Sequence, residues 1–302
     1  MRQLCFVLVA ALTAIALPTT AFAQKAKLPT YTFTSFDAFG SNDTRAGAIN
    51  NDGTSVGYFA GSDGILHGFY HNILWAAGPI QYDDPALTTT STLLQGINNN
   101  GVMSGLAKDS PRGTPDAGSG FIWRGGTDVT TYTVPGASFT AVKGINVFEQ
   151  FAGRFVDSNG HSLGFVQSGD TFTIIDYMGS TSVQCGCIND LGQVEGSYRD
   201  GGGTQRGFLL DSALTTFTDV NYPRSIYTQA LGMNNNNQVV GTYQLARGAK
   251  QGFVLNVATG AYTTVNYPNA YETFVTGITD SGTLVGHWRD SLGMHSFYAV
   301  RK

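Results

Sequence analysis

The stretch that decides the fold is residues 229–257, QALGMNNNNQVVGTYQLARGAKQGFVLNV. A small apolar segment ends at Met233-Asn234, an asparagine cluster follows, and a β-branched segment then leads to Gly241. The pair Gly252-Phe253 opens a third apolar segment. Short segments rich in β-branched and aromatic residues, separated by turns rich in Asn and Gly, predict successive antiparallel strands.

The same pattern occurs six times along the chain. In every copy a glycine stands eight residues after an apolar anchor, and a Gly-Phe pair, or Ser-Phe in the last copy, follows. The anchors are Ile49, Ile97, Ile145, Ile188, Met233 and Ile278, and the glycines are Gly57, Gly105, Gly153, Gly196, Gly241 and Gly286. The steps between anchors are 48, 48, 43, 45 and 45 residues. An offset that is held six times identifies an internal repeat.

Each repeat contains four short predicted strands, the fourth lying in the segment that leads to the next repeat. Four strands and a period near 45 residues are typical of a β-propeller blade. We therefore predict an all-β fold: a six-bladed β-propeller of four-stranded blades, formed by residues 24–302 as a single domain. An open β-solenoid or β-prism is the alternative, but an open stack requires distinct capping repeats, and the sequence shows none.

The two ends of the chain predict how the ring closes. The last repeat stops after its third strand, residues 296–300, and residues 31–38 form a fourth strand that precedes the first repeat. If these two strands pair, the N-terminal strand completes the last blade, and two otherwise exposed strand edges are covered.

Residues 1–23 have the pattern of a secretory signal peptide. Arg2 gives a basic start, residues 5–17 form an apolar run, and Ala21-Phe22-Ala23 fits a cleavage site. We expect a mature chain that begins at Gln24, is secreted or periplasmic, is monomeric and has no membrane span. An N-terminal anchor that is never cleaved is the alternative.

Composition excludes several classes of protein. The net charge is −4, only 13% of residues are charged, and no Lys/Arg-rich run occurs, which argues against a nucleic-acid binder. An aromatic content of 12% argues against disorder. The five histidines lack metalloprotease spacing, and Asp83-Asp84 lacks the alternating oxygen ligands of calcium sites. We therefore expect no metal and no other cofactor.

The repeats resemble the extracellular repeats of the HAF family. That pattern stands here as Gly96-Ile97-Asn98, as Val-Val-Gly-Thr-Tyr over residues 239–243, and as His67-Gly68-Phe69. Glycine replaces the alanine of the family's His-Ala-Phe triplet, and Glu149 and Asn237 replace the turn glycine in two repeats. The resemblance implies export and a propeller-like fold, and it brings no catalytic residue with it.

Ligands of propellers usually bind at the mouth of the central channel, among the linkers and the loops between second and third strands. Residues there that depart from the repeat are the best candidates for function. Glu195 precedes an invariant glycine where the other repeats carry Val, Ser or Ala, and burial would raise its pKa and suit it to general acid catalysis. A salt bridge between blades is the alternative for Glu195. Lys143 occupies an innermost-strand position and is a candidate anion contact, with a solvated lysine in the channel as the alternative.

The loops supply the remaining candidates. Further acid–base candidates are His287, Tyr271 and Glu272. Ligand-binding candidates are Arg45, Asp83, Arg224, Tyr227, Trp288 and Arg289. Aromatic rings that stack and arginines that bind carboxylates suit a carbohydrate, another extracellular polar ligand or a protein partner. The long loop over residues 107–119 is a candidate lid, with a tolerated insertion as the alternative.

Polar residues that recur in equivalent places of several repeats are interpreted as structural. Asp157, Asp200 and Asp290 each precede a glycine-containing turn, which aspartate side chains stabilise. His67 and His295 are predicted to be buried and to hydrogen-bond an adjacent strand.

Cys185 and Cys187 are the only cysteines of the predicted mature chain. Two residues apart in a strand, their Cα atoms would be about 7 Å apart, which is beyond comfortable bridging. We predict two buried thiols, with a strained disulfide as the alternative.

The sequence favours a ligand- or protein-binding module without catalysis. The alternative is an extracellular enzyme of the polysaccharide lyase or glycoside hydrolase type with its site at the channel mouth, and a structural matrix or adhesion protein is a third class. Because propellers host all of these, the fold cannot choose among them. Convergence of Glu195, His287 and the acidic loop residues in one pocket would favour the enzyme.

Overall fold

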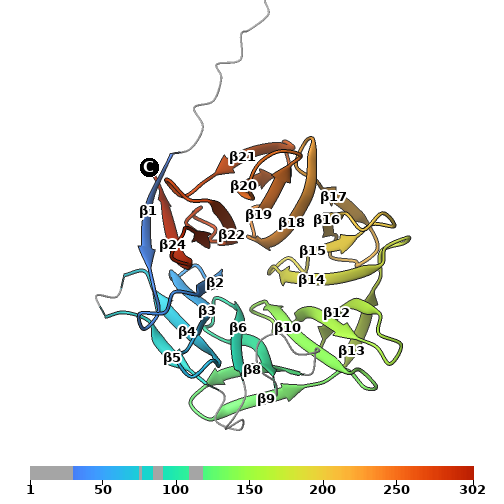
Figure 1. Ribbon diagram of the computed structural model, residues 1–302. Helices are drawn as coiled ribbons and strands as arrows, with labels where there is room; N and C mark the ends of the chain where they lie inside the picture. The colour runs from blue at the N-terminus through green and yellow to red at the C-terminus, as the bar shows by residue number, and fades with distance from the viewer. Residues whose placement is uncertain (1–29, 75–76, 84–90, 109–117) are drawn as a thin grey trace, which may run out of the picture.

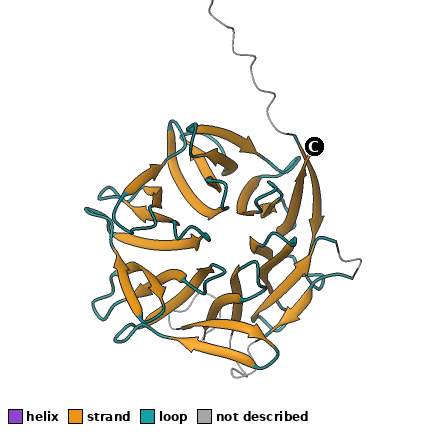
Figure 2. Cartoon of the chain, turned by 180° about the vertical axis from the view of Figure 1, so that it is seen from behind, coloured by secondary structure: helices purple, strands orange, loops and turns teal. Residues whose placement is uncertain are grey.

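The computed structural model describes residues 30–74, 77–83, 91–108 and 118–302. The predicted signal peptide, Asp84 and residues 109–117 of the candidate lid lie outside this part. All elements of the described part are strands, which form six four-stranded antiparallel sheets around a central axis (Figures 1 and 2). No helix able to cross a membrane occurs among the described residues. The predicted six-bladed β-propeller is confirmed.

The strands of blades 1 to 5 run outward from the central axis in chain order, and blade 6 takes its outermost strand from the N-terminus. Blade 1 contains β2 (Thr44–Ile49), β3 (Thr54–Ala60), β4 (Leu66–Asn72) and β5 (Ile80–Tyr82). Blade 2 contains β6 (Ser91–Ile97), β7 (Met103–Lys108), β8 (Ser119–Gly125) and β9 (Asp128–Tyr132). Blade 3 contains β10 (Phe139–Ile145), β11 (Phe151–Val156), β12 (Ser162–Ser168) and β13 (Thr171–Ile175).

The second half of the ring repeats this order. Blade 4 contains β14 (Ser182–Ile188), β15 (Val194–Arg199), β16 (Gln205–Leu210) and β17 (Phe217–Val220). Blade 5 contains β18 (Ser225–Met233), β19 (Gln238–Leu245), β20 (Gln251–Asn256) and β21 (Ala261–Val265). Blade 6 contains β22 (Glu272–Ile278), β23 (Leu284–Arg289), β24 (Met294–Arg301) and the N-terminal strand β1 (Tyr31–Phe36).

The glycine at the fixed offset is required by packing inside the blade. A Cβ atom on Gly241 would overlap the carbonyl oxygen of Gln229 on the innermost strand and would lie 2.9 Å from the ring of Phe253. The equivalent phenylalanine is fully buried in every blade: Phe69, Phe121, Phe165, Phe208, Phe253 and Phe297. The offset of eight residues therefore places a residue without a side chain under the aromatic ring at the centre of each sheet.

The glycine of the Gly-Phe pair lets neighbouring blades approach each other. A Cβ on Gly120 would lie 2.7 Å from the Val142 side chain of the next blade, and one on Gly164 would lie 2.8 Å from Sγ of Cys185. Ser296 takes this place in blade 6, where its hydroxyl accepts a hydrogen bond from the backbone N–H of Ala46 at 2.8 Å. This position is thus a contact between blades.

The two repeats that lack the turn glycine still adopt its conformation. Glu149 has φ = +57° and Asn237 has φ = +55°, in the left-handed region that the glycines of the other repeats occupy, such as Gly101 at +79°. The turn geometry is set by the repeat and is kept even where the residue is not glycine.

The N-terminal strand closes the ring, as the sequence predicts. Strand β1 pairs antiparallel with β24, from Tyr31 opposite Arg301 to Phe36 opposite Ser296 (Figure 1). The ring of Phe33 packs 5.5 Å from those of both Tyr267 and Phe297. Strand β1 therefore completes both the sheet and the apolar packing of blade 6.

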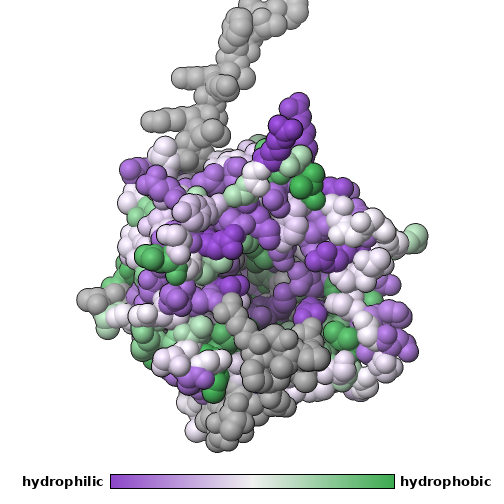
Figure 3. Space-filling view, in the orientation of Figure 1, coloured by the Kyte–Doolittle hydropathy of each residue, from purple (hydrophilic) through white to green (hydrophobic). Residues whose placement is uncertain are grey.

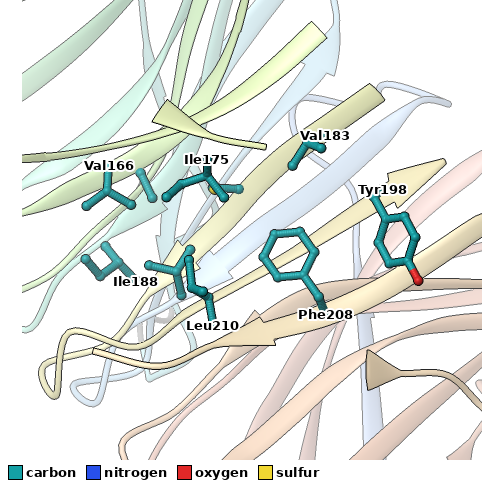
Figure 4. Packing of buried hydrophobic residues seen from close by; sticks show 10 residues of the cluster. Val166, Ile175, Val183, Ile188, Tyr198, Phe208 and Leu210 are labelled. Carbon is teal, nitrogen blue, oxygen red and sulfur yellow. The ribbon is translucent and has the colours of Figure 1, made fainter. Parts of the chain in front are cut away.

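The apolar core lies mainly between adjacent blades. One cluster joins Val166 and Ile175 of blade 3 to Val183, Ile188 and Phe208 of blade 4 (Figure 4). Because each sheet packs against two neighbours, strands are apolar on both faces. Some polar residues are buried between blades, such as Ser296 on β24, and others line the central channel.

Candidate functional site

The six innermost strands surround the central axis of the molecule (Figure 1). They enclose a channel that holds a cavity of about 220 Å³. The residue two places before each anchor lines this cavity in all six blades: Gly47, Gln95, Lys143, Gly186, Leu231 and Thr276. In the space-filling view the centre of the molecule is hollowed, with hydrophilic surface around it (Figure 3). The alternation of strand side chains places every second residue of these strands toward the axis.

One end of the channel is built by the asparagines that follow the anchors. In five blades the side-chain N–H of this asparagine donates to the backbone carbonyl of its counterpart in the next blade, at 2.9–3.3 Å: Asn50, Asn98, Asn146, Asn189 and Asn234. Thr279 takes this place in blade 6. The asparagine of the Ile-Asn pair therefore links its blade to the next one by a hydrogen bond.

A second ring of hydrogen bonds, which sequence reasoning missed, lies one residue further on. The backbone N–H of Asn51 donates to Oδ1 of Asn99 in the next blade, and the N–H of Asp280 donates to Oδ1 of Asn51 across the closing point of the ring. Asp190 and Asn235 continue the pattern, at 2.9 Å. The signal was a polar residue directly after Ile-Asn in most repeats, and Val147 is the exception that lacks an acceptor.

Glu195 is fully buried in blade 4 and lines the channel cavity. Its Oε1 accepts the backbone N–H of Cys187 at 2.7 Å, and Oε2 has no hydrogen-bond partner in the described part of the chain. Gly186 makes room for the carboxyl group, because a Cβ there would lie 2.9 Å from its carboxyl carbon. Burial raises the pKa of Glu195 to about 7, against the opposing effects of the Cys187 N–H and of Lys143.

Lys143 lies in the same cavity, on β10 of the neighbouring blade. Its Nζ donates to Oε1 of Gln184 at 3.0 Å. Burial, and next the charge of Arg154, lower the pKa of Lys143 to about 8. No ion pair joins Glu195 to a described residue, so the salt bridge considered from the sequence is replaced by a bond to the backbone.

Replacing Glu195 with glutamine is expected to remove a pH dependence of stability. The folded-state pKa is raised to about 7, whereas an unfolded glutamate titrates near about 4.3. Between these values the folded state keeps a proton that the unfolded state has lost, so the free energy of unfolding falls as pH rises, by about 4 kcal/mol in total. Glu195→Gln should match the wild type at pH 4 and exceed its stability above pH 7, as measured by urea unfolding across this range.

The matched control is Glu149→Gln, because Glu149 is an exposed carboxylate that forms an ion pair with Arg124 at 2.7 Å. The free energy of unfolding of that variant should fall between pH 4 and 7 as it does in the wild type. If the free energy of unfolding of Glu195→Gln fell with rising pH as steeply as that of the wild type, Glu195 would be charged in the folded state.

His287 and Arg45 also line the channel cavity. Nδ1 of His287 donates to the carbonyl of Ala46 at 3.4 Å, and its ring stacks on Phe274 at 4.7 Å. Burial, and next the charge of Arg45, lower the pKa of His287 to about 4. Nε of Arg45 donates to Asp43 at 2.7 Å. A neutral His287 cannot serve as a proton donor near pH 7.

A second cavity, of about 240 Å³, opens in the channel wall between blades 3, 4 and 5. Every residue that lines it is polar: Arg154, Ser162, Ser182, Gln184, Ser197, Arg199, Gln205, Tyr227 and Gln229. Gln184 and Ser197 line the channel cavity as well. The hydroxyl of Tyr227 donates to Gln229 at 2.5 Å, and Nζ of Lys250 lies 4.5 Å from the centre of the Tyr227 ring. We call this the polar wall cavity.

Several residues predicted from the loops line neither cavity. Tyr271 is 59% exposed, and Glu272 forms an ion pair with Arg289 at 2.9 Å. Trp288 stacks on Tyr267 at 4.2 Å and donates to the Ser35 hydroxyl, so it fastens the closing strand. The other two are Asp83, which binds His67 at 2.9 Å, and Arg224, which lies in a turn with φ = +64°.

The structure brings together only part of the predicted constellation. Glu195, His287, Lys143 and Arg45 line the channel cavity, Tyr227 lines the polar wall cavity, and the acidic loop residues stay outside. Sequence reasoning missed Arg154, although the signal was present: it follows the invariant Gly153, where other repeats place Tyr, Leu, Ser, Thr or His.

The two repeat-matched histidines are structural, but their partners differ from those predicted. His67 is held between Asp63 and Asp83, and His295 between Asp290 and Asp37. They bind carboxylates instead of an adjacent strand. Burial opposes protonation in both, and the paired carboxylates outweigh it, so the pKa of each histidine is raised.

The other structural predictions are confirmed. Oδ1 of Asp200 accepts the backbone N–H groups of Gly202 and Thr204, and Asp157 and Asp290 cap their turns in the same way. Cys185 and Cys187 are both free thiols, as predicted, but only Cys185 is buried and Cys187 is half-buried. Burial raises the pKa of each thiol.

The chain matches no protein-family model and no curated protein sequence. It is similar in structure to the SapL1 lectin in complex with α-methyl fucoside, at 10% identity and a TM-score of 0.55 over 86% of this chain and 95% of that one. A mutant Aleuria aurantia lectin in complex with Fucα1-6GlcNAc matches at 12% identity and a TM-score of 0.54, over 86% and 94%. Trypanosoma rangeli sialidase in complex with the inhibitor DANA matches at 8% and 0.55, over 86% of this chain and 55% of that one. At such identities the likeness is one of fold: this chain shares the β-propeller architecture of these proteins.

Proposed function

We propose that the protein is a carbohydrate-binding β-propeller that holds a saccharide in the polar wall cavity. The observation that carries this proposal is the lining of that cavity, which consists of hydroxyl, amide and guanidinium groups around one aromatic ring. Sugars present many hydroxyl groups that both donate and accept, and such a lining offers partners of both kinds. The shared fold with lectins in complex with fucosides supports the same class of ligand.

The signal-peptide pattern of residues 1–23 and the likeness to HAF repeats support a place of action outside the cytoplasm. A protein in that setting meets polysaccharides and glycoproteins directly, which agrees with a saccharide ligand.

Binding is favoured over catalysis by the state of the acid–base candidates. Glu195 is fully buried, with one oxygen held by a backbone N–H, and His287 is neutral and bonded to a carbonyl. Glycoside hydrolysis ordinarily needs two carboxyl groups that flank the bond to be broken. None of the described residues that line the polar wall cavity carries a carboxylate, so a sugar there meets no such pair among them.

A glycan array followed by calorimetric titration tests the proposal. Tyr227→Ala is expected to weaken binding by about tenfold or more, because it removes the ring and the hydroxyl from the cavity wall. Tyr271→Ala is the matched control, since Tyr271 is exposed and lines neither cavity; it should bind as the wild type does. Thermal melting of both variants checks that the fold is intact.

The same glycans should be assayed for degradation, with Glu195→Gln alongside. Binding without turnover supports the proposal. If the wild type degrades a glycan and Glu195→Gln does not, the protein is an extracellular enzyme and the binding proposal is wrong. If the wild type binds no glycan at all, the proposal is also wrong.

A further inference from the structure

Two side chains of opposite charge line the channel cavity without forming an ion pair with each other. They are Lys143 on β10 and Glu195 on β15 of the next blade. Nζ of Lys143 donates to Oε1 of Gln184 at 3.0 Å, and Oε1 of Glu195 accepts the backbone N–H of Cys187 at 2.7 Å. Buried charges are stable when a group of opposite sign is close to them. Each of these two groups can therefore take a charged partner from a ligand.

The Glu195 carboxyl group takes the place of a channel side chain in blade 4. The channel position there is Gly186, and a Cβ on this glycine would overlap Oε1 of Glu195 and lie 3.2 Å from Oε2. Glu195 is fully buried, and no described residue donates to its Oε2. A buried acceptor without a donor is costly, so this oxygen points to a ligand that carries one.

A second acceptor of this kind lies in blade 2. Gln95 is the channel side chain there, and its buried Oε1 receives no hydrogen bond from the described part of the chain. Three consecutive blades thus offer the amide of Gln95, the ammonium group of Lys143 and the carboxyl group of Glu195. The channel positions of the other three blades carry no charge: Leu231, Thr276 and Gly47.

The other charged groups of the described lining already have partners. Oδ1 of Asp190 and Oδ1 of Asp280 each accept a backbone N–H, at 3.0 and 2.9 Å, in the ring of hydrogen bonds at one end of the channel. Arg45 is bonded to Asp43 at 2.7 Å, and His287 is neutral near pH 7 because burial lowers its pKa to about 4. The separated pair described above is what a charged ligand can engage.

We propose that the channel cavity binds a small zwitterion such as a free amino acid, whose ammonium group donates to Glu195 and Gln95 and whose carboxylate accepts from Lys143. A ligand with both charges pairs both side chains, whereas a ligand with a single charge leaves one side chain unpaired. A cavity of about 220 Å³ has room for about seven water molecules at about 30 Å³ each, close to the number of heavy atoms in a small amino acid. The proposal is independent of carbohydrate binding, because neither Lys143 nor Glu195 lines the polar wall cavity.

Calorimetric titration with alanine, β-alanine and 4-aminobutanoate tests the proposal. At least one of them should bind, and its amide and its N-acetyl derivative, which each lack one charge, should bind about tenfold or more weakly. Glu195→Gln and Lys143→Met should each weaken binding of the zwitterion by about tenfold or more. A derivative with one charge that binds as tightly as the zwitterion would contradict the proposal.

The affinity should also depend on pH. Burial raises the pKa of Glu195 to about 7, and burial, with next the charge of Arg154, lowers that of Lys143 to about 8. The thiols of Cys185 and Cys187, close to these groups, stay protonated because burial raises their pKa. Binding should therefore be tightest between about pH 7 and 8, weakening below as Glu195 gains a proton and above as Lys143 loses one. Glu195→Gln should remove the weakening on the acid side, and a wild-type affinity that is constant from pH 5 to 8 would contradict the proposal.

Gly47→Leu locates the binding site. A Cβ on Gly47 would lie 3.4 Å from its nearest neighbour, and blade 5 carries Leu231 at the same position, so a leucine side chain fits the backbone and fills part of the cavity. This variant should lose zwitterion binding, keep its melting temperature and bind sugars as the wild type does. If it binds the zwitterion as the wild type does, the channel is not the site.

The matched control for charge is Glu149→Gln, since Glu149 lines neither cavity and is paired with Arg124. It should bind the zwitterion as the wild type does. An equal loss in Glu149→Gln and Glu195→Gln would make the effect one of net charge and contradict the proposal. Failure of all three zwitterions to bind would also contradict it, while the proposed carbohydrate binding would still stand.

Discussion

Gly241→Ala is expected to destabilise the protein by about 3 kcal/mol, although it adds only one methyl group. The new Cβ would overlap the backbone carbonyl oxygen of Gln229 and press against the ring of Phe253. Neither can move freely, because the carbonyl belongs to the innermost strand and Phe253 is fully buried between sheets. Overpacking of this kind typically costs about 1–3 kcal/mol, and a clash with backbone is at the upper end. Urea unfolding measures the loss.

The matched control is Gly201→Ala, since Gly201 is exposed and a Cβ there would lie 3.7 Å from its nearest neighbour. That variant should change stability by less than about 0.5 kcal/mol. The double variant Gly241→Ala with Phe253→Leu separates the two clashes. Because the carbonyl of Gln229 remains in the way, shrinking the ring should not restore stability; full restoration would show that only the ring requires the glycine.

Removal of residues 31–36 is expected to cost about 5 kcal/mol or more, an amount comparable with the whole stability of many domains. The deletion leaves the edge of β24 unpaired and takes the ring of Phe33 from its contacts with Tyr267 and Phe297. An unpaired edge is also a template for association with other chains. The truncated protein should melt far below the parent or aggregate, as followed by circular dichroism and light scattering.

A circular permutant tests whether the deletion acts by removing the pairing between the two ends of the chain or only by removing residues. The N–H of Lys302 donates to the carbonyl of Thr30 at 2.8 Å, so a short linker can join these residues and turn β24 and β1 into a hairpin. With new ends between Gly40 and Ser41, the permutant keeps every strand and should remain close to the parent in stability. If the permutant were as unstable as the deletion, pairing of the ends would not be the source of the effect.

The repeat made the fold predictable because its constraints are local. Gly241 and Phe253 belong to adjacent strands of one hairpin, and their spacing follows from strand length and register. Because the same spacing occurs in six copies, only a few repeat architectures fit the sequence. Even the closure could be foreseen, since a fourth strand precedes the first repeat and is missing from the last.

The site was less predictable because its contacts join different repeats. Glu195 stood out within one repeat, and its burial and raised pKa follow from that position. The polar wall cavity combines Arg154, Gln184 and Tyr227 from three blades, and no spacing in the sequence shows that they share a space. Trp288 stands where four other repeats also carry an aromatic residue, and its bond to Ser35 supports the strand that closes the ring.

The pairing of β1 with β24 has a consequence for how the protein is made. Phe36 finds its partner in Ser296, which is synthesised 260 residues later (296 − 36). The earliest strand to leave the ribosome must therefore wait until nearly all of translation is complete, and the ordering of so distant a contact slows folding. During that interval its apolar side chains and free edge are open to other chains, so a nascent propeller of this kind depends on whatever protects unfinished polypeptides in its compartment.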